Sequence, residues 1–323
     1  MGMLIDGQWS DEDSAPPPQS AGAFVRVESA FRDRVTADGA SGFKAEPGRY
    51  HLLVAPSCPW AHRTFLVRAV KKLENAVSIA YADRPKLQGW AFSQAVDDRL
   101  QPTEGVLYLH RVYAEAKPGY TGKVTVPTLW DRKTRTIVNN ESSEIIRMFN
   151  TEFNAWGDAA IDLYPADLRA EIDAINAYVY ERVNNGVYRC GFAKTQEAYA
   201  AAFNKLFEGL DALEERLSRS RYLCGDRITE ADWRLFPTLV RFDPVYHGHF
   251  KCNRQRLADY HNLINYTREL YQVPGVAATV DVQAIKDGYY RWMPHVNPSG
   301  VVPLGPAIDY GLPHDRERLK KAA

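Results

Sequence analysis

A cysteine between a predicted strand and a predicted helix, Cys58, constrains the fold of this chain more than any other feature. The apolar run before it, residues 51–55, is typical of a strand that stops at Pro56. A helical pattern of apolar residues follows over 59–74, and Pro59 suits its first turn, where the N–H that proline lacks is not needed. We therefore expect the Cys58 sulfur at a helix N-terminus, where free N–H groups and the helix dipole favour thiolate over thiol.

The residue three positions after Cys58 is Ala61 and not a second cysteine. A thiolate here cannot close a local disulfide, so a small external thiol has to resolve any adduct that it forms. Glutathione is the obvious candidate for that thiol. The other three cysteines are far apart and form no CxxC pair, so they are predicted to be reduced packing residues: Cys190, Cys224 and Cys252.

Length and composition describe an ordinary globular protein. The chain has 323 residues, which suggests two domains, a formal net charge of +0 and 45% hydrophobic residues. The balanced charge gives no reason to expect a nucleic-acid partner, and no apolar stretch is long enough to cross a membrane. Residues 1–6 lack the basic and apolar regions of a signal peptide. We therefore expect a cytoplasmic protein with no membrane partner.

The order of predicted elements divides the chain into three parts. Residues 1–47 look irregular and include a proline-rich loop over 14–20. Residues 48–154 carry a strand, a helix and a second strand, and then a hairpin and a helix, which is the order of a thioredoxin-like domain. Residues 155–323 show apolar positions at three- and four-residue spacing and are predicted to be all-helical. Within the middle part, strands are expected at 77–81, 125–131 and 136–138, a short extended segment at 107–113, and a helix at 141–149.

The dipeptide Val126-Pro127 stands at the start of a predicted strand. Proline cannot donate to a sheet ladder, so it belongs at a strand start or edge. A trans peptide is the commoner form for an isolated proline. Because this dipeptide follows a strand, a Cys-Pro and a helix, we expect instead a cis peptide beside Cys58, which presents the Val126 backbone to a peptide ligand.

A second ligand site is suggested by Glu141 and Ser142. Two asparagines end a predicted strand, and Glu141-Ser142 opens a helix with an apolar face. Ser142 is expected to cap this helix, whose N–H groups could bind a carboxylate, while Glu141 could meet an ammonium group. An amino-acid head group carries both charges, so the pair suits a γ-glutamyl group. A plain capped helix without a ligand remains the alternative.

Together these motifs resemble one family, the glutathionyl-hydroquinone reductases, which form the xi class of glutathione transferases. The resemblance runs nearly end to end and is carried by Ser57-Cys58-Pro59-Trp60-Ala61-His62-Arg63, residues 124–131, residues 139–146, Arg241-Phe242-Asp243-Pro244-Val245-Tyr246 and residues 297–306. It implies the glutathione-transferase fold, an α/β thioredoxin-like N-terminal domain followed by an all-α C-terminal domain. It also implies glutathione as co-substrate, glutathionyl-hydroquinones as substrates, and a homodimer.

The resemblance implies roles for the matching residues. Cys58 would be the nucleophile. The glutathione site would comprise Trp90 along the peptide, Lys123 at the glycine carboxylate, Val126 at the backbone, and Glu141 with Ser142 at the γ-glutamyl end. Lys123 stands where the family often has arginine. The stretch 291–295 departs from the family pattern.

Three tyrosines match the residues that line the hydroquinone pocket in the family: Tyr188, Tyr246 and Tyr289. Tyr188 and Tyr289 are expected to act in catalysis, and the choice of Tyr289 over the adjoining Tyr290 depends on register alone. From the residues themselves, any one of the 18 tyrosines is by default a packing residue with a solvated hydroxyl. A helix break at 184–186 and a turn or kink at 243–244 are expected just before Tyr188 and Tyr246.

Two other patterns have simpler explanations. His247, His249 and Cys252 resemble a three-ligand metal set, but no fourth ligand is evident, and packing or solvent-facing histidines are the default. No metal is therefore expected. Thr229 and Asp232 have the spacing of a capping box, flanked by Ile228 and Trp233 at the positions of a hydrophobic staple.

Two alternative functions remain open at this stage. One is an omega-like transferase that reduces dehydroascorbate or small mixed disulfides, which would share Cys58 but need no aromatic pocket. The other is a non-enzymatic protein that uses the transferase fold for assembly, which predicts an inert or missing nucleophile. A comparison of substrates separates the first alternative, and glutathione binding together with thiol reactivity separates the second.

Overall fold

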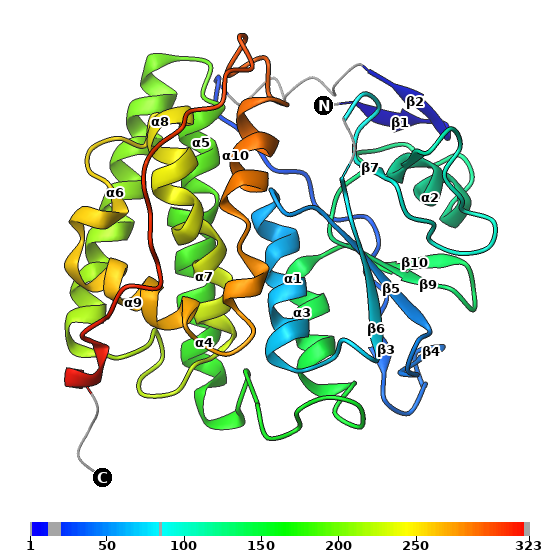
Figure 1. The fold of residues 1–323 in the computed structure, drawn as a ribbon, viewed down its shortest axis with the longest axis horizontal. Coiled ribbons are helices and arrows are strands. Elements are labelled where there is room, and N and C mark those ends of the chain that lie inside the picture. Colours follow the sequence, from blue (N-terminus) through cyan, green and yellow to red (C-terminus); the bar gives the residue numbers. More distant parts are fainter. Residues whose placement is uncertain (1, 12–20, 84–85, 320–323) are drawn as a thin grey trace. The chain divides into compact units, whose positions relative to one another are not determined.

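The computed structural model describes residues 2–11, 21–83 and 86–319, which cluster into two compact units (Figure 1). The first unit contains residues 2–11 and 27–161, and the second contains residues 21–26 and 162–319. The loop predicted over 14–20 lies outside the described residues. Each unit is described here by itself.

A four-stranded sheet forms the centre of the first unit, in the order β10-β9-β5-β6. The central strand β5 runs parallel to β6 and antiparallel to β9, which in turn pairs antiparallel with β10. All five residues of β5 are buried, as expected for a strand covered on both faces. The strands are β5 (Tyr50–Val54), β6 (Val77–Tyr81), β9 (Thr128–Asp131) and β10 (Thr136–Asn139).

Three helices accompany this sheet. Helix α1 (Pro59–Val70) packs against β5 and against α3 (Ser142–Thr151), while α2 (Leu109–Ala116) contacts β10 (Figure 1). This arrangement confirms the predicted thioredoxin-like domain. Helix α1 ends before residue 74 because Lys72, just after the C-cap residue Lys71, takes a positive φ of 55°, and the Leu73 N–H then bonds back to the Arg68 carbonyl at 2.9 Å.

The prediction of an extended segment over 107–113 was wrong for most of that length. Only β8 (Leu107–Tyr108) is extended, and it pairs with β7 (Ala91–Phe92), while α2 begins at Leu109. Leu109, Val112 and Tyr113 are buried, which is the three- and four-residue spacing of a helix face rather than the alternation of a strand.

The N-terminal segment is more ordered than its sequence indicates. A hairpin joins β1 (Met3–Ile5) to β2 (Gln8–Ser10), and β3 (Val35–Thr36) pairs with β4 (Phe43–Lys44). The prediction of an irregular segment was therefore wrong in part. Strands of two or three residues are too short to produce a recognisable alternation, so the sequence carries no periodic signal for them.

The second unit is built of helices, as predicted, and residues 291–315 follow its last long helix as an extended tail without helix. Helix α6 packs against α5 and α9, and α4 packs against α7. Its main helices are α4 (Arg169–Val179), α5 (Gly186–Gly191), α6 (Gln196–Arg219), α7 (Glu230–Arg241), α8 (His247–His249), α9 (His261–Tyr271) and α10 (Val282–Tyr290). Short 3₁₀ turns lie at Ala166–Leu168, Leu257–Asp259, Ala277–Thr279 and Arg316–Leu319.

The predicted capping box at the start of α7 is confirmed. The fully buried Asp232 carboxylate accepts hydrogen bonds from the backbone N–H of Thr229 at 2.7 Å and from its hydroxyl at 3.1 Å. The other carboxylate oxygen of Asp232 accepts from Leu223 N and Tyr266 Oη. Asp232 thus joins the helix start to a neighbouring loop and to α9, which is a structural role.

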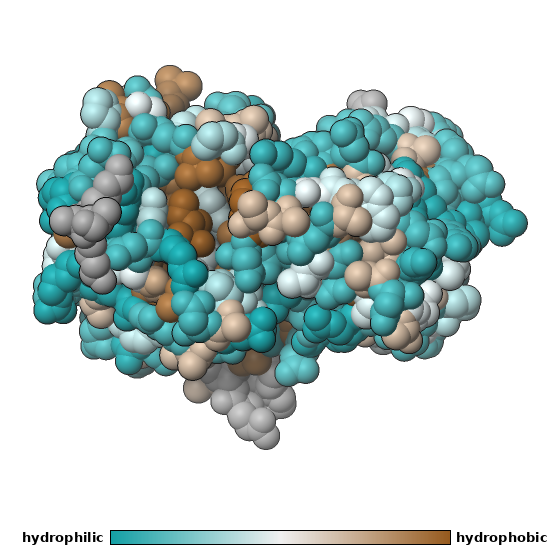
Figure 2. Space-filling model, turned by 90° about the horizontal axis from the view of Figure 1, so that it is seen from below, coloured by the Kyte–Doolittle hydropathy of each residue, from teal (hydrophilic) through white to brown (hydrophobic). Residues whose placement is uncertain are grey.

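Hydrophilic residues predominate on the face seen in Figure 2, and hydrophobic residues gather there in a recess of limited extent. Among the described residues, no helix combines the length and the apolar character that a membrane span requires.

Candidate active site

Cys58 lies at the N-terminus of α1, as the sequence predicts. It is the N-cap residue, with extended backbone angles (φ −80°, ψ 119°), and Pro59 occupies the first helical position. Its side chain is partly exposed, whereas the other three cysteines are buried, and all four are free thiols. Cys58 is therefore the one cysteine of the chain that combines access to solvent with the electrostatic field of a helix N-terminus.

The Val126-Pro127 peptide is cis and lies beside Cys58, which confirms the prediction. The Cys58 Sγ is 3.6 Å from the carbonyl oxygen of Val126. The ladder between β5 and β9 begins at Thr128, so the backbone of Val126 lies just outside the sheet. An extended peptide could pair with this backbone while its own sulfur approaches Cys58.

The start of α3 differs in detail from the prediction. Glu141, not Ser142, is the N-cap: its Oε1 accepts hydrogen bonds from Ser143 N at 3.0 Å and Ser143 Oγ at 2.8 Å. Ser142 is already the first helical residue. The glutamate side chain is long enough to fold back onto the second N–H of the helix, and this places its charge at the positive end of the helix dipole.

The Ser142 hydroxyl is left for another purpose. Its oxygen is buried and has no hydrogen-bond partner among the described residues. An unpaired buried hydroxyl is costly, so a hydrogen-bond partner supplied by a ligand would remove that cost. Because it lies at the positive end of the α3 dipole, this hydroxyl suits a carboxylate.

Glu141 is ionised at neutral pH. Burial acts to raise its pKa, but hydrogen bonds from Ser143 and Ser29 and the positive charge of Arg63 outweigh this and lower the pKa overall. Because Arg63 belongs to α1, this interaction also links the starts of α1 and α3, the two helix N-termini that carry Cys58 and Ser142.

Trp90 lies in the loop before β7, where a lysine covers its ring. The Lys86 Nζ is 3.7 Å from the centre of the Trp90 indole, a cation–π contact. Burial lowers the pKa of Lys86 to about 8, while the charge of Cys58 acts in the opposite direction. Trp90 and Lys86 therefore belong to the surroundings of the Cys58 sulfur. Lys123 lies three residues before Val126, and its carbonyl accepts from Tyr120 Oη at 3.1 Å.

A separate polar cluster lies within the second unit, where Tyr188, Tyr246 and Tyr289 meet. The Tyr289 hydroxyl is 2.6 Å from that of Tyr188 and 3.0 Å from that of Tyr246. The structure thereby settles the register: Tyr289 joins this cluster, whereas the hydroxyl of Tyr290 turns to the Pro244 carbonyl at 3.4 Å.

Two π-helical segments position these tyrosines. One, Tyr180–Asn184, joins α4 to α5 just before Tyr188, and the other, Phe242–Tyr246, ends at Tyr246 itself. The backbone stays helical through 184–185, where a break was expected, and the turn or kink expected at 243–244 takes the form of a π-helical turn. The helices continue, but one wider turn shifts the direction of the side chains that follow, a device often found at functional sites.

Tyr246 and Tyr289 of this cluster hold their protons at neutral pH. Burial raises the pKa of Tyr246 and of Tyr289 well above the usual value, and the nearby Arg241 only partly opposes it. Tyr188 carries a cation on its ring, because the guanidinium carbon of Arg26 lies 4.9 Å from the ring centre. A chain of three linked phenols can donate a proton at one end and restore it along the hydrogen bonds.

The pattern His247, His249 and Cys252 shows no metal arrangement. Among the described residues there is no group of three or more His, Cys, Asp or Glu side chains that could hold a metal ion. The His249 ring packs on Phe250 and on Tyr290, and burial lowers its pKa to about 4.

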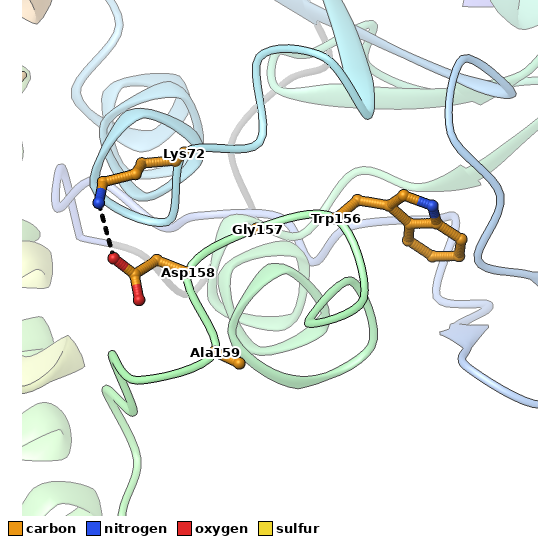
Figure 3. Close-up of a pocket in the computed structure, with 5 residues that line it drawn as sticks. All are labelled: Lys72, Trp156, Gly157, Asp158 and Ala159. Carbon is orange, nitrogen blue, oxygen red and sulfur yellow. Dashed lines mark hydrogen bonds and ion pairs between the residues drawn. The ribbon is translucent and has the colours of Figure 1, made fainter.

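A surface hollow of about 380 Å³ lies at the opposite end of α1 from Cys58, in the loop after α3 (Figure 3). An ion pair between Lys72 and Asp158, 2.8 Å from Nζ to Oδ2, lies at its rim, and Trp156 turns its ring away from that pair. With its 12 residues, α1 is about 18 Å long, so this hollow is remote from the thiol.

Comparison with known proteins places this geometry in a family. Residues 57–152 match the glutathione S-transferase N-terminal domain and residues 196–269 match its C-terminal domain. The chain is 51% identical to a glutathionyl-hydroquinone reductase of Sphingobium chlorophenolicum, over 95% of this chain and 97% of that protein. It is 48% identical to the glutathionyl-hydroquinone reductase of Escherichia coli K12, over 98% and 99% of the two chains. The chain belongs to the xi class of glutathione transferases.

Solved structures of the xi class agree with this assignment. The glutathione-bound structure of the Escherichia coli protein superposes with a TM-score of 0.86 at 45% identity, over 98% of this chain and 99% of that chain. A xi-class transferase from Natrialba magadii gives a TM-score of 0.89 at 45% identity, over 99% and 97%. The glutathione-transferase fold predicted from the sequence is therefore confirmed.

Within each unit of this xi-class chain, sequence reasoning missed residues that contact the predicted site residues. Lys86 covers Trp90, Ser29 donates to Glu141, and Arg26 covers Tyr188. Ser29 and Arg26 lie in the segment that was predicted to be irregular, and Lys86 lies in a loop. Neither a motif nor a periodicity marks them, so only the folded structure could reveal them.

Proposed function

We propose that this protein is a glutathionyl-hydroquinone reductase, which removes glutathione from glutathionyl-hydroquinones through a mixed disulfide on Cys58. The proposal rests above all on one observation: a partly exposed thiol at the N-cap of α1, with its sulfur 3.6 Å from the Val126 carbonyl and Ala61 in place of a second cysteine. The names of the two relatives at 48% and 51% identity support the same activity.

In the proposal, the first unit binds glutathione. The peptide backbone pairs with Val126, and Trp90 lies along the chain of the ligand. The γ-glutamyl carboxylate binds to the Ser142 hydroxyl at the N-terminus of α3, and the γ-glutamyl ammonium group binds to the Glu141 carboxylate. Lys123 neutralises the glycine carboxylate.

The reaction begins at the ring of the substrate. An aryl thioether resists attack at sulfur because an aryl carbanion is a poor leaving group. Addition of a proton to the ring carbon that bears sulfur, with loss of the proton of a ring hydroxyl, gives an α-thio ketone. The Cys58 thiolate then attacks the glutathione sulfur, the carbon–sulfur bond breaks, and its electron pair forms an enolate. This enolate is the anion of the aromatic hydroquinone, and protonation of its oxygen gives the hydroquinone itself.

Turnover is completed by a second glutathione. Its thiolate attacks the Cys58–glutathione disulfide, forms oxidised glutathione and releases the Cys58 thiolate. The ring carbon is thereby reduced by two electrons, which come from two glutathione sulfurs, the thioether sulfur of the substrate and the thiol of the second glutathione. Ala61 fits this scheme because a second cysteine at that position would compete with the external thiol.

The three tyrosines are proposed to move the protons. Tyr188 and Tyr289 would donate to the substrate ring and its developing oxyanion, and Tyr246 would line the pocket with them. The protonated state of Tyr246 and Tyr289 at neutral pH supports the role of donor.

The decisive experiment measures steady-state turnover of glutathionyl-menadiol with excess glutathione. Wild type is compared with Cys58→Ala and with Cys224→Ala, which removes a buried thiol of the second unit. We expect free hydroquinone from wild type and Cys224→Ala only, and dehydroascorbate as a second substrate should be reduced far more slowly. Full activity of Cys58→Ala would exclude the mechanism. Activity confined to dehydroascorbate or mixed disulfides would favour an omega-like function and remove the proposed role of the tyrosines.

We further propose that the protein is a cytoplasmic homodimer. The four free cysteines agree with a reducing compartment. Light scattering during size-exclusion chromatography tests the dimer, since a mass of a single 36.5 kDa chain would contradict it.

A further inference from the structure

The N-terminal segment around residues 29–33 is attached to the end of β10, next to the start of α3. Phe31 and Asn140 exchange two hydrogen bonds: Phe31 N donates to Asn140 Oδ1 at 3.0 Å, and Asn140 N donates to Phe31 O at 3.1 Å. Arg32 lies opposite Asn139 as in an antiparallel pair. The segment therefore extends the edge of the sheet beside β10.

Side chains hold the segment in this place. Arg32 forms an ion pair with Glu144 of α3, and Asn139 Nδ2 donates to the Asp33 carbonyl at 2.9 Å. The Phe31 ring packs edge-on against Tyr113, with 5.4 Å between ring centres and an interplanar angle of 89°. These contacts lie on the C-terminal side of Ser29 and fix its position relative to Glu141.

Ser29 donates its single hydroxyl proton towards Glu141. Its Oγ is 3.0 Å from Glu141 Oε2 and 3.3 Å from the Asn140 carbonyl. The carboxylate is the favoured acceptor because it is nearer and carries a charge.

A count of acceptor sites on Glu141 shows why this matters. A carboxylate offers about four lone-pair sites, two on each oxygen. Ser143 N and Ser143 Oγ occupy those of Oε1, and Ser29 Oγ occupies one on Oε2. One site is left, on the oxygen that Ser29 holds, so any further donor has to approach Oε2 beside the Ser29 hydroxyl.

We propose that Ser29 is a positioning residue of the glutathione site, which orients Glu141 Oε2 towards the ammonium group of the γ-glutamyl moiety. This inference rests on the proposed function, because it takes Glu141 as the partner of that ammonium group. It gives the N-terminal segment a role in ligand recognition as well as in folding. Ser29 also helps to keep Glu141 ionised, since its hydrogen bond lowers the pKa of that carboxyl.

The proposal is tested by calorimetry, which measures the affinity of the full-length protein for two ligands. The first ligand is S-methylglutathione, which cannot react with Cys58. The second is the same peptide with a glutaryl group in place of γ-glutamyl, so that only the ammonium group is missing. Ser29→Ala should weaken S-methylglutathione about tenfold and the glutaryl peptide less than about twofold. Ser29→Thr, which keeps the hydroxyl, should restore most of the affinity.

A matched control is available twelve residues further along the N-terminal part of the chain. Ser41 bonds with Thr36 and Phe43 and has no contact with Glu141, so Ser41→Ala should bind both ligands as wild type does. Equal weakening of both ligands by Ser29→Ala, or no weakening, would overturn the role of Ser29. If wild type itself binds the two ligands equally, the assignment of Glu141 to the ammonium group fails, and with it this inference. Absence of S-methylglutathione binding would overturn the proposed function.

Discussion

The thiol site of the first unit and the tyrosine cluster of the second are built in different ways. The thiol site uses main-chain groups: the N-terminus of α1 at Cys58, the backbone of Val126 before a cis proline, and the N-terminus of α3. The tyrosine cluster consists of side-chain hydroxyls from three separate helical elements, and Tyr188 and Tyr289 are 101 positions apart. Main-chain geometry follows from local sequence, whereas the meeting of side-chain tips depends on how helices pack.

This difference predicts how each region responds to substitution. In the thiol site, single residues act through backbone groups or fixed charges, so their loss should affect binding and thiol reactivity separately. In the tyrosine cluster, the hydroxyls are linked, so loss of the Tyr289 hydroxyl should remove two hydrogen bonds of the cluster at once. Four substitutions test this contrast.

The largest effect is expected at the centre of the tyrosine cluster. Tyr289→Phe removes the hydroxyl that bonds with both Tyr188 and Tyr246 but keeps the ring. We expect kcat for the hydroquinone reaction to fall about a hundredfold, because proton donation is lost, while the Kd for glutathione stays unchanged. Tyr290→Phe is the matched control and should keep nearly full activity. A smaller loss in Tyr289→Phe than in Tyr290→Phe would contradict the register found here.

Glu141→Gln keeps the shape of the γ-glutamyl site but removes its charge. At pH 7 the KM for glutathione should rise about tenfold, because a charge-assisted hydrogen bond becomes a neutral one. The folded pKa of Glu141 is lowered, so its ionised form stabilises the fold above the unfolded pKa, near the usual value of 4.5, and this contribution is lost as the pH falls through the folded pKa. Thermal unfolding of wild type and variant should therefore converge as the pH falls below 4.5. A constant difference between pH 7 and pH 3 would argue against an ionised Glu141.

Lys86→Met separates stability from reactivity. The pKa of Lys86 is about 8 in the folded protein, against the usual 10.5. Between pH 8 and pH 10.5, therefore, the Lys86 side chain is protonated in the unfolded chain but neutral in the folded protein. The free energy of unfolding of wild type therefore rises with pH across that window, and below pH 8 the fold bears the cost of a desolvated ammonium. Lys86→Met should be more stable at pH 7, by about 1 kcal/mol, and should lose this advantage above pH 10.

The same variant should have a less reactive thiol. If the Cys58 charge favours the ammonium form of Lys86, the ammonium favours the thiolate to the same extent. Alkylation of Cys58 by iodoacetamide at pH 7 should slow about fivefold in Lys86→Met. Lys117→Met, which removes an exposed lysine after α2, should alkylate at the wild-type rate. Unchanged alkylation in Lys86→Met would show that the helix N-terminus alone activates the thiol.

The smallest effect on activity is expected for a residue that serves the fold alone. Thr229→Ala removes the hydroxyl that bonds with Asp232 at the start of α7 and should lower the free energy of unfolding by about 1 kcal/mol. Chemical denaturation measures the loss of stability. Steady-state kinetics on the same variant should give the wild-type kcat and the wild-type KM for glutathione. A change in kcat would mean that the capping box and the tyrosine cluster are coupled.

Prediction from sequence succeeded where a local pattern has one physical explanation. The Cys-Pro pair after an apolar strand, the Val-Pro dipeptide before the next strand, and the Thr229–Asp232 spacing each specify backbone geometry within a few residues. The errors fell where two explanations compete over a short length. Residues 109–113 have apolar positions that suit a strand or a helix, and Ser142 and Glu141 are both able to cap α3. The side chain that reaches the free N–H decided the second case.

The sequence by itself determined the fold class, the place of Cys58 at a helix N-terminus and the backbone groups that surround it, because helix starts, prolines and apolar periodicity act over short distances along the chain. Only the tertiary structure decided that Tyr289 rather than Tyr290 joins the tyrosine cluster. It also placed Lys86 over Trp90 and Ser29 against Glu141. Each of these contacts joins residues whose approach depends on packing and on loop paths, for which no local pattern exists in the sequence.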